Sequence, residues 1–177
     1  MIGILIMGRN ESAVRVVGHS SRVSLENCSL CSNTAERGAG FLLEGGDTSV
    51  TGSHVIGNRA QEGAGFYVAG GRVRLTLVLL AENHAEKAGG ALCVIGGSVT
   101  LSRVAVHAAA QSDAQTRGDA LFLQQKRGLA IRLENVTFTT APNRSLEVRG
   151  FETVWLSGVT VSEFDCTNNP TRCDTGT

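Results

Sequence analysis

The sequence predicts an all-β protein folded as a right-handed parallel β-helix, a solenoid of about six coils with roughly 25 residues and three short strands per coil. Asn33, Asn58 and Asn83 follow one another at intervals of 25 residues, each two residues before an alanine. A pair of glycines follows each of these asparagines: Gly45-Gly46, Gly70-Gly71 and Gly96-Gly97. Self-similarity at this period is typical of repeat proteins, in which each unit buries its apolar side against its neighbours.

Alternating apolar residues in each repeat indicate strands with one buried side. The inward positions of the first strands are Val23 and Leu25, Thr48 and Val50, Val73 and Leu75, Val99 and Leu101, Ile131 and Leu133, Val154 and Leu156. Those of the second strands run from Cys28 and Leu30 to Val159 and Val161. A third strand follows each glycine cluster, with Phe41 and Leu43, Phe66 and Val68, Ala91 and Cys93, Ala120 and Phe122 predicted to point inward.

Two polar features support this register. Asn33, Asn58 and Asn83 are predicted to stack about 4.8 Å apart as a ladder of hydrogen-bonded amides. The turn between the first and second strands needs a left-handed residue, which Asn and Gly tolerate best. Four of the six turn positions hold one of these residues, namely Asn27, Gly52, Asn135 and Gly158, whereas Leu77 and Arg103 occupy the other two.

The pattern divides the chain into a solenoid and a tail. Residues 1–161 are predicted to form the β-helix, with clear repeats over 14–161 and an incomplete first coil before them. Residues 162–177 are predicted to be a polar tail or cap that covers the last strand edge. Cys166 and Cys173 flank a turn-rich stretch of this tail and are candidate partners in a disulfide.

The composition of the chain argues against several classes of function. Sixteen basic and sixteen acidic residues give no net charge, which argues against a general nucleic-acid binder. The apolar runs are too short to span a membrane, and no signal peptide is predicted. The spacing of the five cysteines fits no zinc site, so neither a metal nor a cofactor is expected. Sequons at Asn10, Asn27, Asn135 and Asn143 are compatible with a secreted chain.

Two short motifs connect the chain to a known family. Gly89-Gly90-Ala91-Leu92 matches the motif GGA-[ILV] in full, and Gly38–Phe41 and Gly63–Phe66 match it loosely. Leu30-Cys-Ser-Asn33 matches FxxN with an aliphatic residue in place of Phe. Over residues 14–161 the chain resembles the polymorphic outer-membrane protein repeats and related pectin-lyase-like proteins. The resemblance implies an extracellular, adhesin-like or passive solenoid, within a larger surface or secreted protein or assembly.

A leucine-rich repeat is the alternative fold. The segment Leu25-x-x-Cys28-x-Leu30-x-x-Asn33 also fits the pattern LxxLxLxxN, and such a fold would bind partner proteins. Against it, Ala35 stands where the leucine-rich repeat has a Leu, and the glycine cluster leads into a third strand.

Catalysis by a carbohydrate-active β-helix is the alternative function. Glycoside hydrolysis needs two carboxylates that converge on one face. The predicted outward positions of the first strands are instead Ser24, Ser49, Arg74, Thr100, Arg132 and Trp155, without an acid–base pair. The sequence therefore predicts a non-catalytic module, with Arg74, Arg132 and Trp155 as candidate carbohydrate contacts.

The predicted outward positions of the third strands form an apolar stripe: Val17, Leu42, Tyr67, Leu92 and Leu121. A solvent-exposed stripe of this kind is unfavourable, so a protein partner, a second copy or a neighbouring domain is expected to cover it. The alternative is that residues 124–128 or the C-terminal segment fold over it. Beside the stripe, Arg37, Glu62 and Lys87 are predicted to share one position in successive coils.

Overall fold

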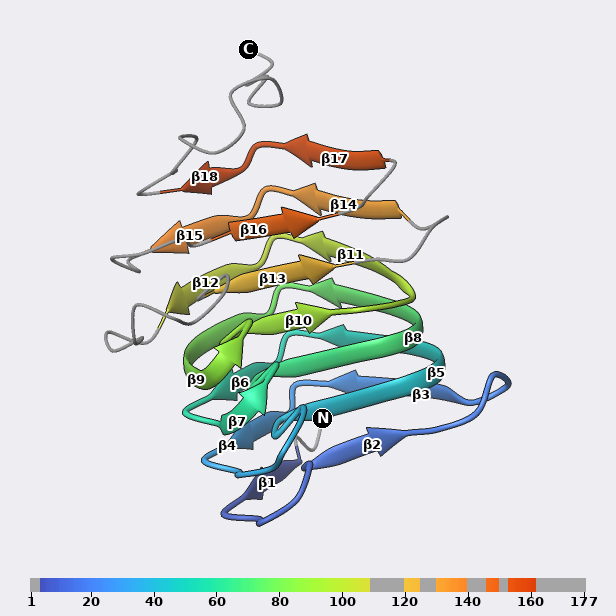
Figure 1. Cartoon of the computed structure of the whole chain (residues 1–177), viewed down its shortest axis with the longest axis vertical. Helices are drawn as coiled ribbons and strands as arrows, with labels where there is room; N and C mark the ends of the chain where they lie inside the picture. The colour runs from blue at the N-terminus through green and yellow to red at the C-terminus, as the bar shows by residue number, and fades with distance from the viewer. Residues whose placement is uncertain (1–3, 109–119, 125–129, 140–145, 150–152, 162–177) are drawn as a thin grey trace.

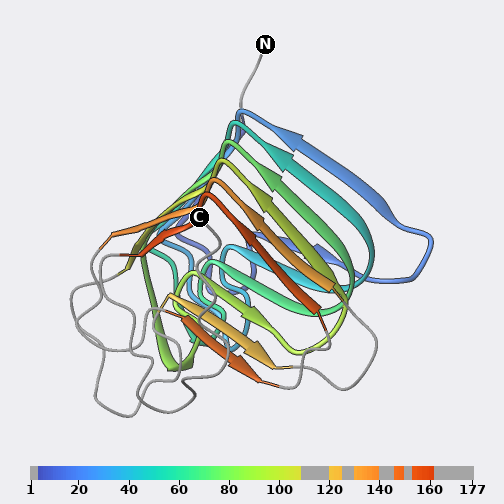
Figure 2. The same ribbon diagram turned by 90° about the horizontal axis from the view of Figure 1, so that it is seen from above.

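The computed structural model describes residues 4–108, 120–124, 130–139, 146–149 and 153–161, and it is an all-β parallel solenoid. Its turns lie about 25 residues apart, as predicted, and there are about five of them rather than six. Seen from above, the chain runs counter-clockwise as it rises towards its C-terminal strands, which makes the solenoid right-handed (Figures 1 and 2). The predicted fold class is therefore confirmed.

The second strands of successive coils form one side of the solenoid (Figure 1). They pair in the order β1 (Leu5–Met7), β4 (Ser29–Cys31), β6 (His54–Ile56), β9 (Leu79–Ala88), β12 (Ala105–Ala108), β15 (Thr137–Thr139) and β18 (Thr160–Val161). A short strand, β7 (Arg59–Glu62), pairs with the later part of β9.

The first and third strands belong to one continuous sheet of ten strands, which bends between them. The sheet contains β2 (Val14–Val16), β3 (Arg22–Glu26), β5 (Phe41–Thr51), β8 (Phe66–Thr76), β10 (Leu92–Val94), β11 (Ser98–Ser102), β13 (Leu121–Gln124), β14 (Ala130–Glu134), β16 (Leu146–Arg149) and β17 (Thr153–Ser157). In β5 and β8 a third strand continues directly into the next first strand. Gly46 and Gly71 bend these strands with φ of 78° and 82°, which glycine adopts without steric cost.

The core lies between the two sheets and follows the rows predicted for the first and second strands, whereas Cys93 and Phe122, predicted to point inward from the third strands, lie outside it. In the first strands, Val50, Leu75, Leu101 and Leu133 pair in register and are buried. Their contacts with the second-strand and third-strand rows form one continuous apolar cluster along the solenoid. Burial of apolar side chains between stacked coils is thus what holds the coils together.

All six predicted turn residues adopt a left-handed conformation. The φ angles are 52° for Asn27, 58° for Gly52, 54° for Leu77, 53° for Arg103, 50° for Asn135 and 59° for Gly158. The coil geometry therefore imposes this conformation even on Leu77 and Arg103, where the side chain disfavours it. A second left-handed turn, which was not predicted, follows the second strand at Gly8, Ser32, Gly57 and Glu82.

The predicted asparagine ladder is present. Asn33, Asn58 and Asn83 are buried, and the Nδ2 group of each of the first two donates to Oδ1 of the next, at 3.0 and 2.9 Å. The same Oδ1 atoms accept the backbone N–H of Asn33 and Asn58. Asn58 Nδ2 also donates to the Leu30 carbonyl at 2.9 Å. The ladder satisfies polar groups that the tight turn would otherwise leave buried and unpaired.

After Asn83 the repeat gains one residue. Ala60 pairs with Ala85, but Glu62 pairs with Ala88, so two residues of one coil face one residue of the coil before. Lys87 is therefore not aligned with Glu62, contrary to the prediction, although Arg37 and Glu62 are bridge partners. A register shift of one residue exchanges the inward and outward sides of the strand that follows.

This shift corrects the predicted third-strand stripe. Leu92 pairs with Phe66, and Leu121 pairs with Leu92, so both leucines point into the core and are fully buried. Val17 lies just beyond β2 and is 56% exposed, so it does not belong to the row either. The true outward row keeps only two of the predicted residues. It consists of Arg15, Leu42, Tyr67, Cys93, Phe122 and Glu147.

Candidate functional site

One outer face of the ten-stranded sheet is open and polar, and we call it the first-strand face. It consists of the outward side chains of β3, 47–51, 72–76, β11, β14 and β17. Strand pairing places its central row in register as predicted, in the order Ser24, Ser49, Arg74, Thr100, Arg132 and Trp155. With strands about 4.8 Å apart, six positions extend over about 24 Å. The face therefore presents a straight array of side chains along the solenoid axis.

The cations of this face point into solvent. Arg72 and Arg74 are exposed, and among the described residues neither forms an ion pair. Arg132 is also exposed and forms an ion pair with Glu134 at 2.5 Å. Towards the N-terminal end, the face is hollowed into a shallow depression, which Arg22, Ser24, Asp47, Ser49 and Arg74 help to line.

Trp155 stands at the C-terminal end of the central row. Its side chain is 63% exposed, and Arg132 is its partner on the neighbouring strand. An indole with this exposure has one apolar surface free for contact. The three predicted carbohydrate contacts thus lie on one row, with Thr100 between Arg74 and Arg132.

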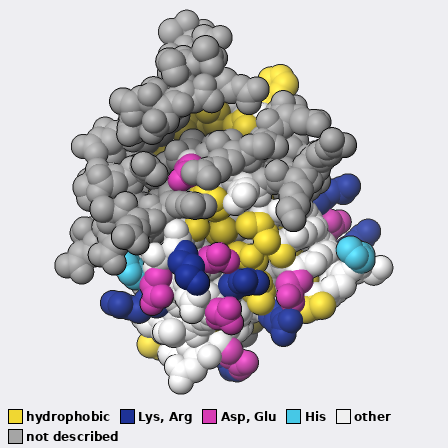
Figure 3. Space-filling model, in the orientation of Figure 1, with side chains coloured by type: hydrophobic (Ala, Val, Ile, Leu, Met, Phe, Trp, Pro, Cys, Tyr) yellow, Lys and Arg dark blue, Asp and Glu magenta, His cyan; other side chains and the backbone are white. Residues whose placement is uncertain are grey.

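The third-strand face is the other outer surface, formed by the row from Arg15 to Glu147. Tyr67, Cys93 and Phe122 are 3%, 1% and 4% exposed and form a second apolar cluster with Ala88, outside the main core. Leu42 is partly buried against them. Figure 3 shows hydrophobic side chains on this side of the molecule, bordered by charged side chains. Because three of these residues are already buried in one chain, they leave little apolar surface for a partner.

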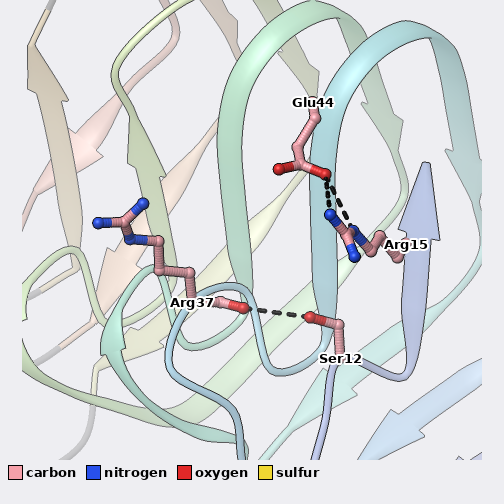
Figure 4. Close-up of polar contacts among 4 residues, drawn as sticks. All are labelled: Ser12, Arg15, Arg37 and Glu44. Carbon is pink, nitrogen blue, oxygen red and sulfur yellow. Dashed lines mark hydrogen bonds and ion pairs between the residues drawn. The ribbon is translucent and has the colours of Figure 1, made fainter. Parts of the chain in front are cut away.

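Paired charged side chains border the third-strand face at its N-terminal end. Arg37 forms an ion pair with Glu62 at 3.3 Å, and its guanidinium lies 5.5 Å from the centre of the Tyr67 ring. The Tyr67 hydroxyl donates a hydrogen bond to Glu62. Below them, Arg15 contacts Glu44 at 2.7 Å, and the Ser12 hydroxyl donates to the Arg37 carbonyl (Figure 4). These contacts connect successive coils and hold Tyr67 in place.

Burial on this face changes two pKa values. It raises the pKa of the Cys93 thiol from 9.0 to about 12, and the negative charge of Glu62 adds to the increase. Burial also raises the pKa of Tyr67 from 10.0 to about 12, although the positive charge of Arg37 opposes it. Both groups are therefore held in their neutral forms inside the fold.

Alkaline pH is expected to destabilise the protein through these two groups. Cys93 and Tyr67 lose protons in the unfolded chain first, so their contribution to stability is complete below pH 9 and is lost as the pH rises from 9 to about 12. Each such proton lowers the free energy of unfolding by about 1.4 kcal/mol per pH unit. Urea unfolding followed by circular dichroism over this range should show a shallower decline for Cys93→Ala. Cys31→Ala, a control at a partly exposed thiol, should decline like the wild type; equal slopes for all three proteins would contradict the assignment.

The cysteines and the sequon asparagines predicted as candidates do not form a common site in the described residues. Cys28 and Cys93 are buried and Cys31 is partly exposed, and all three are free thiols. Cys166, Cys173 and Asn143 lie outside the described residues, as does the predicted tail. The other three sequon asparagines, Asn10, Asn27 and Asn135, are exposed. In the described ranges, no three His, Cys, Asp or Glu side chains come together in a group that could hold a metal ion.

Comparisons of the chain with protein-family models, with curated proteins and with solved structures found no match. Over the residues that the structure describes, no helix has the length and apolar character needed to cross a membrane. The fold and its two outer faces define the protein as a parallel β-solenoid repeat protein.

Proposed function

We propose that the protein is a non-catalytic binding module of the structural or adhesive kind, and that it binds an elongated acidic polysaccharide along the first-strand face. The observation that carries the proposal is the single row in which Arg74, Thr100, Arg132 and Trp155 lie in register and point outwards. A straight array of side chains matches a linear polymer better than a compact ligand, because successive ligand units can meet successive coils.

The chemistry of the row favours acidic sugars. Arginine binds carboxylate and sulfate groups through two parallel hydrogen bonds, and an arginine without an ion pair loses no existing partner on binding. Arg74 in the central row and Arg72 on the neighbouring outward row provide two such cations. Hydroxyl side chains at Ser49 and Thr100 can exchange hydrogen bonds with sugar hydroxyls, and the Trp155 ring can pack against the apolar surface of a sugar ring.

The absence of catalysis is also part of the proposal. The described part of the central row carries no carboxylate, whereas glycosidic bond cleavage by a paired mechanism requires two. Glu134 lies on the neighbouring outward row and is engaged by Arg132. We place the module outside the cell or at its surface, on the resemblance of its glycine motifs to the polymorphic outer-membrane protein repeats.

Binding to polygalacturonate and heparin, with dextran as the neutral control, tests the proposal. Arg74→Gln is expected to weaken binding to the acidic polymers by about tenfold, the loss of one charged hydrogen-bonded contact. Trp155→Ala alone should weaken binding to the acidic polymers more than Arg74→Gln does. Arg59→Gln is the matched control, because Arg59 is exposed on β7, away from the first-strand face, and its replacement changes the net charge equally.

Isothermal titration calorimetry at two salt concentrations would measure these affinities. Equal losses in Arg74→Gln and Arg59→Gln would mean that general charge, not this row, attracts the polymer. Binding to neither acidic polymer would overturn the proposed ligand. Release of reducing ends or of unsaturated sugars from either polymer would overturn the non-catalytic assignment.

A further inference from the structure

The shallow depression on the first-strand face results from a contrast in side-chain length. It extends over three neighbouring strands, β3, β5 and β8. Ser24, Asp47 and Ser49 contribute short side chains to its lining. Arg22 and Arg74, which have long side chains, lie at opposite ends of a diagonal across it. The short residues therefore leave a hollow that the arginines border.

Three arginines, Arg22, Arg72 and Arg74, surround these short side chains. The first two share one outward row with Asp47 between them, so their backbones lie about 9.6 Å apart at about 4.8 Å per strand. All three are exposed, and in the described part of the chain none of them forms an ion pair. Their guanidinium groups can therefore approach one anion in the hollow from two sides.

The depression concentrates positive charge in a chain that has no net charge. Its three arginines and one aspartate give a local charge of +2 (3 − 1). Like charges held close together repel one another, and an anion bound between them replaces that repulsion with attraction. The pairing of β3, β5 and β8 fixes the backbone beneath these side chains, so an anion can bind without a rearrangement of the fold.

We infer that the depression holds a sulfate ester group, so that the ligand of the first-strand face is a sulfated polysaccharide rather than one with carboxylates alone. The inference rests on the proposed function, because it names a substituent of the ligand at the same face. One arginine fork satisfies both oxygens of a planar carboxylate. The three terminal oxygens of a sulfate ester point in different directions, so they match arginines on two sides and the hydroxyls of Ser24 and Ser49 below.

Asp47 favours a sulfated sugar over a free sulfate ion. Arginine side chains only donate hydrogen bonds, whereas an ionised carboxylate only accepts them. A sugar ring that carries a sulfate ester also carries hydroxyl groups, which can donate to Asp47 beside the arginines. A free sulfate ion has no proton to donate, so it meets only the negative charge of this side chain. The depression therefore suits a sulfate group attached to a sugar.

Chondroitin sulfate and unsulfated chondroitin test the inference, because they share one sugar backbone and the same carboxylates. By isothermal titration calorimetry, the wild type is expected to bind the sulfated polymer at least about tenfold more tightly. Arg22→Gln should weaken binding to chondroitin sulfate about tenfold and leave binding to chondroitin unchanged. Ser24→Leu fills the hollow without a change of charge and should also weaken binding to chondroitin sulfate. Arg59→Gln, the charge-matched control on β7, should leave both affinities unchanged.

The outcomes separate this inference from the proposed function. Equal affinity of the wild type for the two polymers would overturn the inference and leave the proposed function standing. A loss in Arg22→Gln that is the same for both polymers, or that Arg59→Gln reproduces, would also overturn it. So would free sulfate that binds the protein as tightly as the sulfated polymer. Binding of neither polymer would overturn the proposed function and the inference together.

Discussion

Replacement of Asn58 by alanine is expected to lower the free energy of unfolding by about 4 kcal/mol. Asn58 Oδ1 accepts two hydrogen bonds from Asn33, and its Nδ2 group donates to the Leu30 carbonyl and to Asn83. Alanine leaves the backbone N–H of Asn33 and the Leu30 carbonyl buried without these partners, at a cost of about 1–3 kcal/mol for each group. Urea unfolding monitored by circular dichroism measures the loss.

Two other asparagines serve as controls for Asn58→Ala, one outside the ladder and one at its end. Asn10→Ala removes an exposed amide outside the ladder and should change stability by less than about 0.5 kcal/mol. Asn33→Ala, at the end of the ladder, should have an intermediate effect, because Asn33 has only one asparagine neighbour. A loss in Asn58→Ala no larger than that in Asn10→Ala would show that the ladder contributes nothing to stability.

Gly63→Ala is expected to be the second most damaging substitution, with a loss of about 3 kcal/mol or more. The backbone at Gly63 has φ of 58°, and a Cβ there would lie 2.4 Å from the Phe66 carbonyl oxygen and 2.9 Å from Tyr67 Cα. These are backbone atoms at the start of β8, which cannot move without disturbing its pairing with β5 and β10. The same measurement of urea unfolding applies.

Gly57→Ala is the matched comparison. Gly57 has a similar φ of 65°, but its nearest neighbour would be Ser32 Oγ at 3.7 Å, an ordinary contact. Only the left-handed backbone conformation then disfavours alanine, by about 1 kcal/mol. The difference between the two variants therefore isolates the steric clash. Equal losses would mean that the close approach of the backbone at Gly63 has no energetic consequence.

The features that sequence could predict are those that repeat at a constant interval. The asparagines at 33, 58 and 83 keep a constant spacing, and their stacked amides give a local chemical reason for the residue type. The first three turns after the first strand, at residues 27, 52 and 77, keep the same interval. The inward rows of the first strand were predictable for the same reason, since apolar alternation has only one buried side. These rows also placed Arg74, Arg132 and Trp155 together correctly.

The sequence-based predictions fail where the interval between repeats changes, or where the residue type gives no indication of the backbone conformation. One extra residue at Glu86–Lys87 reverses the parity of the third strand, so Leu92 rather than Ala91 takes the inward position that Phe66 holds in the coil before. The second left-handed turn was missed because Ser32 and Glu82 are not residues that favour positive φ. The enclosure of Tyr67 by Arg37 and Glu62 depends on contacts between coils, which a single strand's pattern does not contain.

The extra residue at Glu86–Lys87 has a consequence for the use of this protein as a scaffold. The coil accommodates the added length between Ala85 and Ala88, both buried, while Leu92 beyond them is fully enclosed. Glu86 and Lys87 themselves are exposed. A short foreign peptide grafted between them would therefore be displayed from the side of the solenoid, at the cost of the hydrogen bond from Lys87 Nζ to Gln61 Oε1.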